Sequence, residues 1–193
     1  MGEEIDLQPV VHITTDAIGQ PGKRVFYIQA WQNTRTITLI VEKIQIQSLA
    51  VALEQFLAEI QTRYPELPEA PGDYEEDRMH IRPPVDPMFR VGELGLGYDA
   101  DNDLVVLVAR EMVADAGGDE GEAGGESSPA REDPSGAADD ARVVRFWCTR
   151  AQLRAMCRWG MEVAARGRPI CPQCGEPIDP QGHFCPKKNG HKH

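Results

Sequence analysis

The sequence predicts an α+β fold, in which two helices pack on an antiparallel sheet and a zinc knuckle follows at the C-terminal end. Three observations predict it. Short β-branched segments come in pairs separated by turn residues, two segments repeat apolar residues at helical spacing, and the last part of the chain concentrates Cys and His. Hydrophobic residues make up 41% of the 193 residues, which is enough for a core.

The first half of the chain predicts three strands and a helix. Residues 10–15 are rich in β-branched side chains, and residues 24–30 and 36–41 predict a hairpin with a turn between them. Proline disfavours the helical conformation of the residue before it, so the following helix ends at Pro65. Residues 65–87, rich in Pro, Glu and Asp, predict a surface loop that could wrap the sheet. The apolar stripe of the helix consists of Ile46, Leu49, Leu53, Phe56, Leu57 and Ile60.

The second half predicts three more strands and a second helix. Residues 89–98, 104–109 and 142–147 are apolar or β-branched, and the second of these segments is apolar enough for a central strand. Thr149 and Gln152 have the spacing of a capping box, which predicts the start of the helix. The apolar face of this helix consists of Leu153, Met156, Cys157, Gly160, Met161 and Ala164.

A weak internal repeat relates the two helices. Val41-Glu-Lys-Ile-Gln45-Ile46 aligns with Cys148-Thr-Arg-Ala-Gln152-Leu153, and each segment follows a pair of strands. Two β-β-α units side by side would form one antiparallel sheet with both helices on one face. The repeat therefore predicts a duplication within one domain.

An acidic segment interrupts the second unit. Residues 114–141 are mainly Gly, Ala, Ser, Glu and Asp, with almost nothing to bury, which predicts a disordered insertion in a hairpin. We therefore expect residues 1–113 and 142–168 to form a single α+β domain, and residues 169–193 to form the knuckle.

The strongest chemical signal is Cys171-Pro-Gln-Cys174-Gly, which predicts a tight turn that aims two thiolates at one point. Cys185 supplies a third ligand. The fourth is His191 or His183: we favour His191, although His183 lies two residues before Cys185 and would point to the same side of an extended segment. Three Cys and one His close the shell of a structural Zn²⁺ site rather than leave the open position of a catalytic one. A redox role is disfavoured because the motif follows a helix instead of beginning one.

Charge is distributed unevenly. Residues 1–113 carry a net charge of −10, residues 114–141 a net charge of −8, and residues 142–193 a net charge of +7. Arg150, Arg154 and Arg158 share a helix face, and arginine binds phosphate through paired donors, so these three form a candidate anion site. The alternative, which we favour, is a solvated face or one covered by the acidic segments of the chain itself.

Other patterns are weak or exclude functions. Asp99-x-Asp101-x-Asp103 resembles half of a calcium loop, but the remaining ligand positions fail, which leaves a polar turn. The chain lacks an apolar run of membrane-spanning length, and its acidic start lacks the features of a signal peptide, so we expect a cytoplasmic protein without membrane contact. In that compartment five Cys favour metal over disulfides.

Several segments together resemble a known family. They are Arg24-Val-Phe-Tyr-Ile-Gln-Ala, Val41-Glu-Lys-Ile-Gln, Asp86-Pro-Met-Phe-Arg-Val-Gly, Arg145-Phe-Trp-Cys-Thr-Arg-Ala-Gln and the segment from Gly167 to Gly190. In this order they resemble a bacterial family catalogued only as a domain of unknown function, number 3090. The resemblance implies no activity. It implies a shared pathway with a phosphomutase-like protein, and it puts His191 in doubt, because members often end this segment in Asn-Gly-Tyr.

We expect a zinc-stabilised cytoplasmic binding or adaptor protein that presents its knuckle and basic helix to a protein or phosphate-bearing partner. The first alternative is nucleic-acid binding through the basic C-terminal face. The second is an enzyme or accessory protein for a phosphorylated metabolite, with His80 and the nearby Arg78, Arg82 and Arg90 as its pocket. No Ser-His-Asp or paired-carboxylate pattern supports catalysis.

Overall fold

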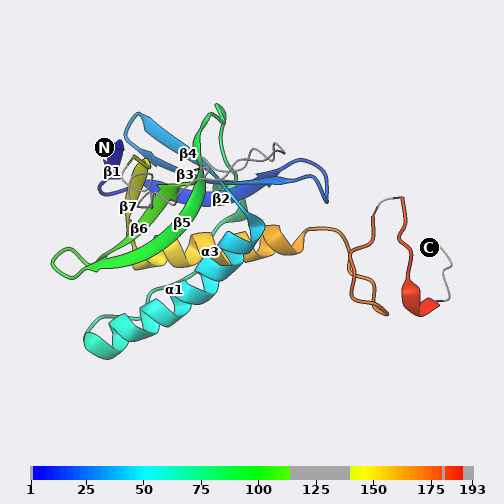
Figure 1. Ribbon diagram of the computed structural model, residues 1–193. Coiled ribbons are helices and arrows are strands. Elements are labelled where there is room, and N and C mark those ends of the chain that lie inside the picture. The colour runs from blue at the N-terminus through cyan, green and yellow to red at the C-terminus, as the bar shows by residue number, and fades with distance from the viewer. Residues whose placement is uncertain (1, 114–139, 180, 189–193) are drawn as a thin grey trace, which may run out of the picture.

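The computed structural model describes residues 2–113, 140–179 and 181–188 (Figure 1). The acidic insertion predicted at residues 114–141 lies almost entirely outside them. The strands are β1 (Glu4–Leu7), β2 (His12–Ile18), β3 (Val25–Gln32), β4 (Arg35–Val41), β5 (Pro87–Asp99), β6 (Leu104–Glu111) and β7 (Val143–Thr149). The helices are α1 (Lys43–Arg63), α2 (Glu76–Met79), α3 (Arg150–Ala165) and a short 3-10 turn, η1 (Pro186–Lys188). None of the described helices is long and apolar enough to cross a membrane.

The seven strands form one mixed sheet in the order β1-β7-β6-β5-β4-β3-β2. The expected antiparallel sheet is wrong at two places, because β4 pairs with β5 in parallel and β1 pairs with β7 in parallel. The first parallel pair follows from connectivity: the chain leaves β4 through α1 and a long crossover before it enters β5. The second involves β1, which sequence analysis did not predict because it has only four residues, two of them acidic.

The two edges of the sheet meet. Strands β1 and β2 are consecutive in the chain, and the four residues between them bend the chain from one edge to the other. Within this bend the Val10 N–H donates to the Trp147 carbonyl of β7 at 2.9 Å, and the Val11 N–H donates to the Trp31 carbonyl of β3 at 2.8 Å. The sheet therefore curls until it closes on itself, and β1 and β2 together behave as one bent strand.

The strand registers reveal two copies of one unit. In β3 and β4, Ala30 pairs with Ile37; in β6 and β7, Ala109 pairs with Val144. The β5 strand corresponds to β1 and β2 together: Pro87 pairs with Thr38 of β4 as Asp6 pairs with Arg145 of β7. The expected β-β-α unit is therefore one strand too short. The repeated unit is β-β-β-α, and its first strand is shared between the two halves of the closed sheet.

Equivalent glutamines fasten each helix to the other unit. Gln45 Oε1 accepts a hydrogen bond from the Glu42 N–H at 2.7 Å, and its Nε2 donates to the carbonyls of Val91 and Gly92 at 3.1 and 3.2 Å. Gln152 repeats this arrangement, with the Thr149 N–H at 2.9 Å and the carbonyls of Val10 and Val11 at 3.4 and 3.1 Å. The capping box predicted at Thr149 is confirmed. Each glutamine also supplies a contact between the repeats.

Helices α1 and α3 lie antiparallel beside one another on one side of the sheet (Figure 1). They are in contact at Gly160 of α3, where a Cβ atom would lie 2.7 Å from methyl carbons of Ile46 on α1 and Thr15 on β2. Glycine is therefore required here by space. Around this contact the core gathers buried side chains from both repeats, among them Leu53, Phe146 and Trp159.

The chain between α1 and β5, residues 64–86, forms a segment that we call the strap. It first runs along α3 and then crosses the sheet, where the Thr14 hydroxyl donates to the Met79 carbonyl. Gln29 then holds Arg82 by two bonds: Oε1 accepts from the Arg82 N–H at 2.8 Å, and Nε2 donates to its carbonyl at 3.0 Å. The loop that the sequence predicted therefore wraps the sheet, and it contains the one-turn helix α2.

Candidate metal centre

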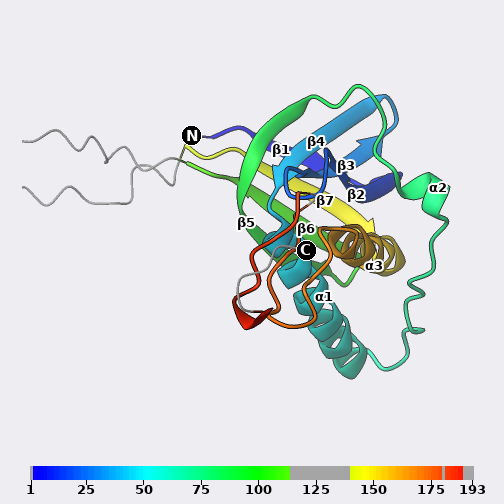
Figure 2. The same ribbon diagram turned by 90° about the vertical axis from the view of Figure 1, so that its right-hand side faces the viewer.

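The chain after α3 projects beyond the end of that helix and forms what we call the knuckle arm (residues 166–188; Figure 1). Figure 2 looks at the arm end-on, in front of the domain. Ile170 and Pro177 form a two-residue β-bridge. Between them the Cys171 N–H donates to the Glu176 carbonyl at 2.8 Å, and the Gly175 N–H donates to the Cys171 carbonyl at 2.9 Å. Gly175 has a φ of +78°, which side chains disfavour, so the glycine after Cys174 is needed for the turn.

This turn brings four donor side chains together. The ligand atoms of Cys171, Cys174, His183 and Cys185 all lie within 4.8 Å of one another. Cys171 Sγ is 3.8 Å from Cys185 Sγ, and Cys174 Sγ is 3.8 Å from His183 Nε2. A tetrahedral zinc ion with Zn–S bonds of about 2.3 Å requires sulfur atoms about 3.8 Å apart. The observed spacing is therefore that of ligands around one small ion.

The backbone prepares one thiol for metal binding. The pKa of Cys171 is lowered to about 7, first by the backbone N–H of Cys174 and then by that of Gln173, both of which hydrogen-bond its sulfur. Thiolate, rather than thiol, is the form that binds metal. Cys171 and Cys185 are also buried within the arm, while Cys174 and His183 are partly exposed.

Of the predicted ligands, the structure gathers the three cysteines with His183. His191, which the sequence favoured as the fourth ligand, lies outside the described residues. His183 turns Nε2 toward Cys174, while its Nδ1 is buried without a hydrogen-bond partner in the described structure. An imidazole held in this way has one nitrogen directed at the metal position.

The two remaining cysteines belong to the core. Cys148 is the second-last residue of β7 and Cys157 lies on α3, and both are buried. Burial raises the pKa of both thiols, that of Cys157 to about 12. These side chains are therefore protonated and apolar in character, which agrees with the apolar setting read from the sequence.

The arginines proposed as an anion site lie along α3, facing the strap. Arg150 donates to both carboxylate oxygens of Asp103, at 2.8 and 3.0 Å. Arg154 donates to Glu54 at 2.8 and 2.9 Å and to Glu69 at 3.0 Å. Two of these guanidinium groups are thus paired with carboxylates of the chain itself.

The other polar patterns also have local explanations. Asp99 accepts hydrogen bonds from the backbone of Asp101 and Asn102, and so forms the polar turn between β5 and β6. The residues suggested as a phosphate pocket have different partners. His80 pairs with Asp16 at 3.0 Å, Arg78 with Glu75 at 3.8 Å and Arg90 with Glu42, while Arg82 lies over the ring of Trp31.

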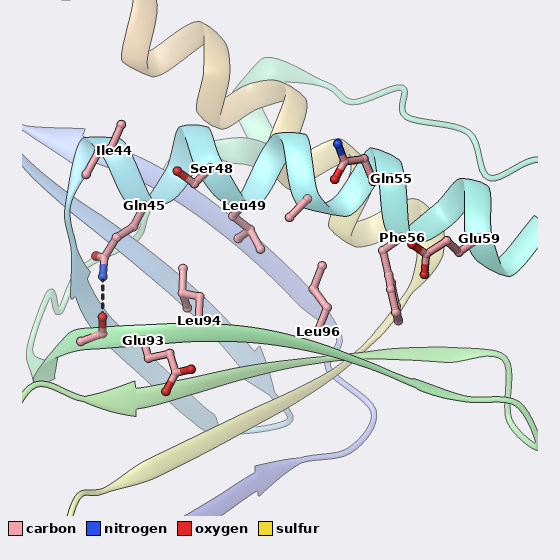
Figure 3. Close-up of a pocket in the computed structure, with 12 residues that line it drawn as sticks. Ile44, Gln45, Ser48, Leu49, Gln55, Phe56, Glu59, Glu93, Leu94 and Leu96 are labelled. Carbon is pink, nitrogen blue, oxygen red and sulfur yellow. Dashed lines mark hydrogen bonds between the residues drawn. The ribbon is translucent and has the colours of Figure 1, made fainter. Parts of the chain in front are cut away.

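Sequence reasoning missed a groove between α1 and β5 with a volume of about 510 Å³ (Figure 3). Leu94 and Leu96 rise from β5 toward Leu49 and Phe56 of α1, and Glu59 lies beside Phe56 at one end of the groove (Figure 3). The Glu93 side chain points to the opposite side of β5 (Figure 3), where its carboxylate lies 3.9 Å from Arg110. The internal repeat was the signal that could have found it, because the same groove exists between α3 and β2.

One comparison with known proteins finds a match. A family described as "Protein of unknown function (DUF3090)" matches residues 5–185, which is most of the chain. The matched region ends at Cys185, so it contains all four clustered donors and excludes His191. No curated protein and no solved structure matches the chain.

Proposed function

The chain belongs to the family described as Protein of unknown function (DUF3090), and because that family brings no activity with it, we propose from the metal centre that the protein is a zinc-stabilised binding protein. The observation that carries the proposal is the convergence of three thiols and one imidazole within 4.8 Å. Thiolate and imidazole ligands in a tetrahedron suit zinc better than calcium or magnesium, which prefer oxygen ligands.

The zinc has a structural role in this proposal. Three Cys and His183 fill four positions, which leaves no open site for a substrate or an activated water. The knuckle arm is too short to bury a core of its own, so metal binding supplies the free energy that orders it. Removal of zinc would therefore unfold the arm and leave the closed sheet in place.

The arm is the contact surface of the proposed binding protein. It carries two large apolar side chains in water, Ile170 at 59% exposure and Phe184 at 65%. Phe184 lies between the ligands His183 and Cys185, so the metal would hold its ring in one place. A rigid exposed aromatic residue is a frequent anchor of protein interfaces.

The alternatives receive less support. Nucleic-acid binding through α3 would require free guanidinium groups, whereas Arg150 and Arg154 are paired with carboxylates. An enzyme for a phosphorylated metabolite would require His80 and the neighbouring arginines to converge, whereas Arg90 pairs with Glu42 and His80 with Asp16.

Metal analysis of the purified protein, kept reduced throughout, tests the zinc site. We expect one zinc ion per chain by native mass spectrometry, lost with a chelator. Cobalt substitution should produce the absorption bands of a tetrahedral thiolate site. Cys174→Ser and His183→Ala should each weaken zinc retention at least tenfold, because each removes one of four ligands.

Two variants serve as matched controls. Cys157→Ala removes a buried thiol that is not in the cluster, and His191→Ala removes the alternative imidazole; both should retain zinc. A reduced protein without zinc would contradict the proposal. Loss of zinc on the His191 change, with retention on the His183 change, would assign the fourth ligand to His191.

A further inference from the structure

The internal repeat creates two equivalent grooves between a helix and the first strand of the other unit. The groove between α3 and β2 is lined by Ala151, Gln152, Ala155, Val11, His12 and Ile13. The groove between α1 and β5 is lined by the equivalent residues Ile44, Gln45, Ser48, Gly92, Glu93 and Leu94 (Figure 3). In both, the capping glutamine donates to two successive carbonyls of the strand. The two grooves are therefore the same site in two copies.

The strap walls one of these grooves. Asp73, Tyr74 and Met79 complete the α3–β2 groove, with Tyr74 edge-on to Trp159 at 5.7 Å between ring centroids and Met79 buried. In the α1–β5 groove the position of Trp159 is taken by Ala52, and Ile44 on its rim is 66% exposed. The molecule thus shows what can wall such a groove: a chain segment that carries an aromatic and an aliphatic side chain.

Chain order identifies the segment that could wall the second groove. The strap follows α1, and the knuckle arm follows α3, so the two segments are equivalent in the repeat. Their starting points are also equivalent. Near the start of the strap, the Pro68 carbonyl accepts a hydrogen bond from Arg150, the first residue of α3, at 2.9 Å. Near the start of the arm, Gly167 lies beside Lys43, which is the residue of α1 equivalent to Arg150.

Charge agrees with this assignment. The strap, with seven Asp and Glu against two Arg, lies on the arginines of α3. Residues 166–188 have the opposite balance, four Lys and Arg against two Asp and Glu. On α1 the positions of Arg154, Arg158 and Arg166 are occupied by Gln47, Val51 and Glu59. An apolar groove with Glu59 at one end, and without the arginines of α3, fits a basic arm with exposed Ile170 and Phe184.

We propose that the α1–β5 groove receives the knuckle arm of a second copy of this chain, so that two chains exchange arms in a symmetric dimer. The arm in its own chain points beyond the end of α3, away from α1 (Figure 1). Its root is held in that direction because Arg168 packs against Gly22 in the β2–β3 turn. Within the arm, Arg168 also pairs with Asp179 at 2.5 Å. An arm directed outward meets a neighbour, and a twofold axis then satisfies both grooves. This inference rests on the proposed function, since zinc must shape the arm.

Sedimentation equilibrium of the zinc-loaded full chain tests the proposal. The wild type should be a dimer that dissociates when a chelator removes zinc. Ile44→Lys places a positive charge, the same sign as that of the arm, at the rim of the groove and should weaken dimerisation at least tenfold. Its matched control is Val11→Lys, which has a similar exposure of 60% at the equivalent groove that the strap already walls; it should leave the dimer unchanged.

A mixing experiment separates arm exchange from any other dimer. Phe184→Ser removes the proposed anchor of the arm, so this variant and Ile44→Lys should each be monomeric alone. Mixed together they should form a heterodimer with one intact contact, the Phe184 arm of the Ile44→Lys chain in the unaltered groove of the other. Zinc content, measured in the same samples, must stay at one ion per chain. Failure of the mixture to associate would overturn the proposal.

Cross-linking of the unaltered protein does not depend on how any variant folds. In a mixture of ¹⁴N and ¹⁵N chains, a zero-length reagent should join Lys187 to Glu59 between differently labelled chains. Links only within one chain, or a zinc-loaded wild type that stays monomeric, would refute arm exchange while leaving the zinc site intact. A chain without zinc would remove both proposals.

Discussion

At the scale of single residues, the Asp103 carboxylate joins three parts of the fold. It accepts hydrogen bonds from the Tyr98 hydroxyl of β5 at 2.8 Å and from two nitrogens of Arg150 at the start of α3. Arg150 in turn donates to the Pro68 carbonyl of the strap. The Arg150 side chain is only 8% exposed, so its charge depends on this carboxylate. The hydrogen bond from Arg150 lowers the pKa of Asp103.

Asp103→Asn should destabilise the protein at neutral pH by about 1–2 kcal/mol, because Arg150 loses its charged partner. The lowered pKa of Asp103 means that its carboxylate stabilises the folded state above the usual Asp pKa of about 3.9. That contribution is lost as pH falls through the lowered folded-state pKa. Urea denaturation at pH 7 and at about pH 3 should therefore show a smaller difference in the free energy of unfolding between wild type and variant at the acidic pH. Asn tolerates the positive φ of 49° at this position, so backbone strain does not confuse the result. An equal difference at both pH values would argue against the ion pair.

At the scale of elements, α3 holds the strap turn by turn. Successive positions four residues apart on the helix meet strap positions two residues apart, as is seen for Arg150 with Pro68 and Arg154 with Ala70. The series continues with Tyr74, whose hydroxyl donates to Glu162, and ends with Glu76, which pairs with Arg166 at 2.9 Å. An extended chain and a helix stay in step because two extended residues rise about as far as four helical ones. The strap is therefore attached by polar contacts along its first half.

Arg154→Gln should loosen the strap without unfolding the domain. The change removes the bonds to Glu69 and to the Ala70 carbonyl, so residues 69–75 should exchange amide hydrogen faster by roughly tenfold. Hydrogen exchange with mass spectrometry measures this directly. Arg35→Gln, at an exposed arginine of β4, is the control and should leave the strap unchanged. Acceleration in the core strands as well would mean that the strap unfolds only together with the sheet.

At the scale of the whole molecule, two copies of a β-β-β-α unit close around each other. The helix of each unit caps its own start with a glutamine and uses the same side chain to hold the first strand of the other unit. The contacts that form each unit and those that join the two units therefore share residues. We expect the two units to unfold together.

Gln45→Ala and Gln152→Ala should each destabilise the protein by about 1–2 kcal/mol, because each removes a helix cap and a bond between the units. The two sites lie at distant helix ends, so the double variant should show the sum of both effects in one cooperative transition. Gln55→Ala, an exposed glutamine of α1, is the control and should change stability by less than about 0.5 kcal/mol. A second, separate transition in either variant would contradict the coupling of the units.

The amino-acid sequence by itself determined the features that local interactions decide. The capping box at Thr149, the stripe of α1 and the Cys-x-x-Cys-Gly turn each depend on residues within a few positions of one another, and each was predicted correctly. The sequence also showed that Gln45 and Gln152 occupy equivalent positions of an internal repeat, although the predicted repeat contained two strands instead of three.

Tertiary structure alone decided which distant segments meet. The four residues of β1 form a strand because they pair with β7, which is more than 130 positions away in the sequence. The parallel pairing of β4 with β5 follows from the path of the strap. The basic face of α3 is paired within the chain, because carboxylates distant in the sequence lie against it: Asp103 pairs with Arg150, and Glu69 of the strap pairs with Arg154. Local sequence patterns do not predict such long-range contacts, because the contacts depend on how the whole chain folds.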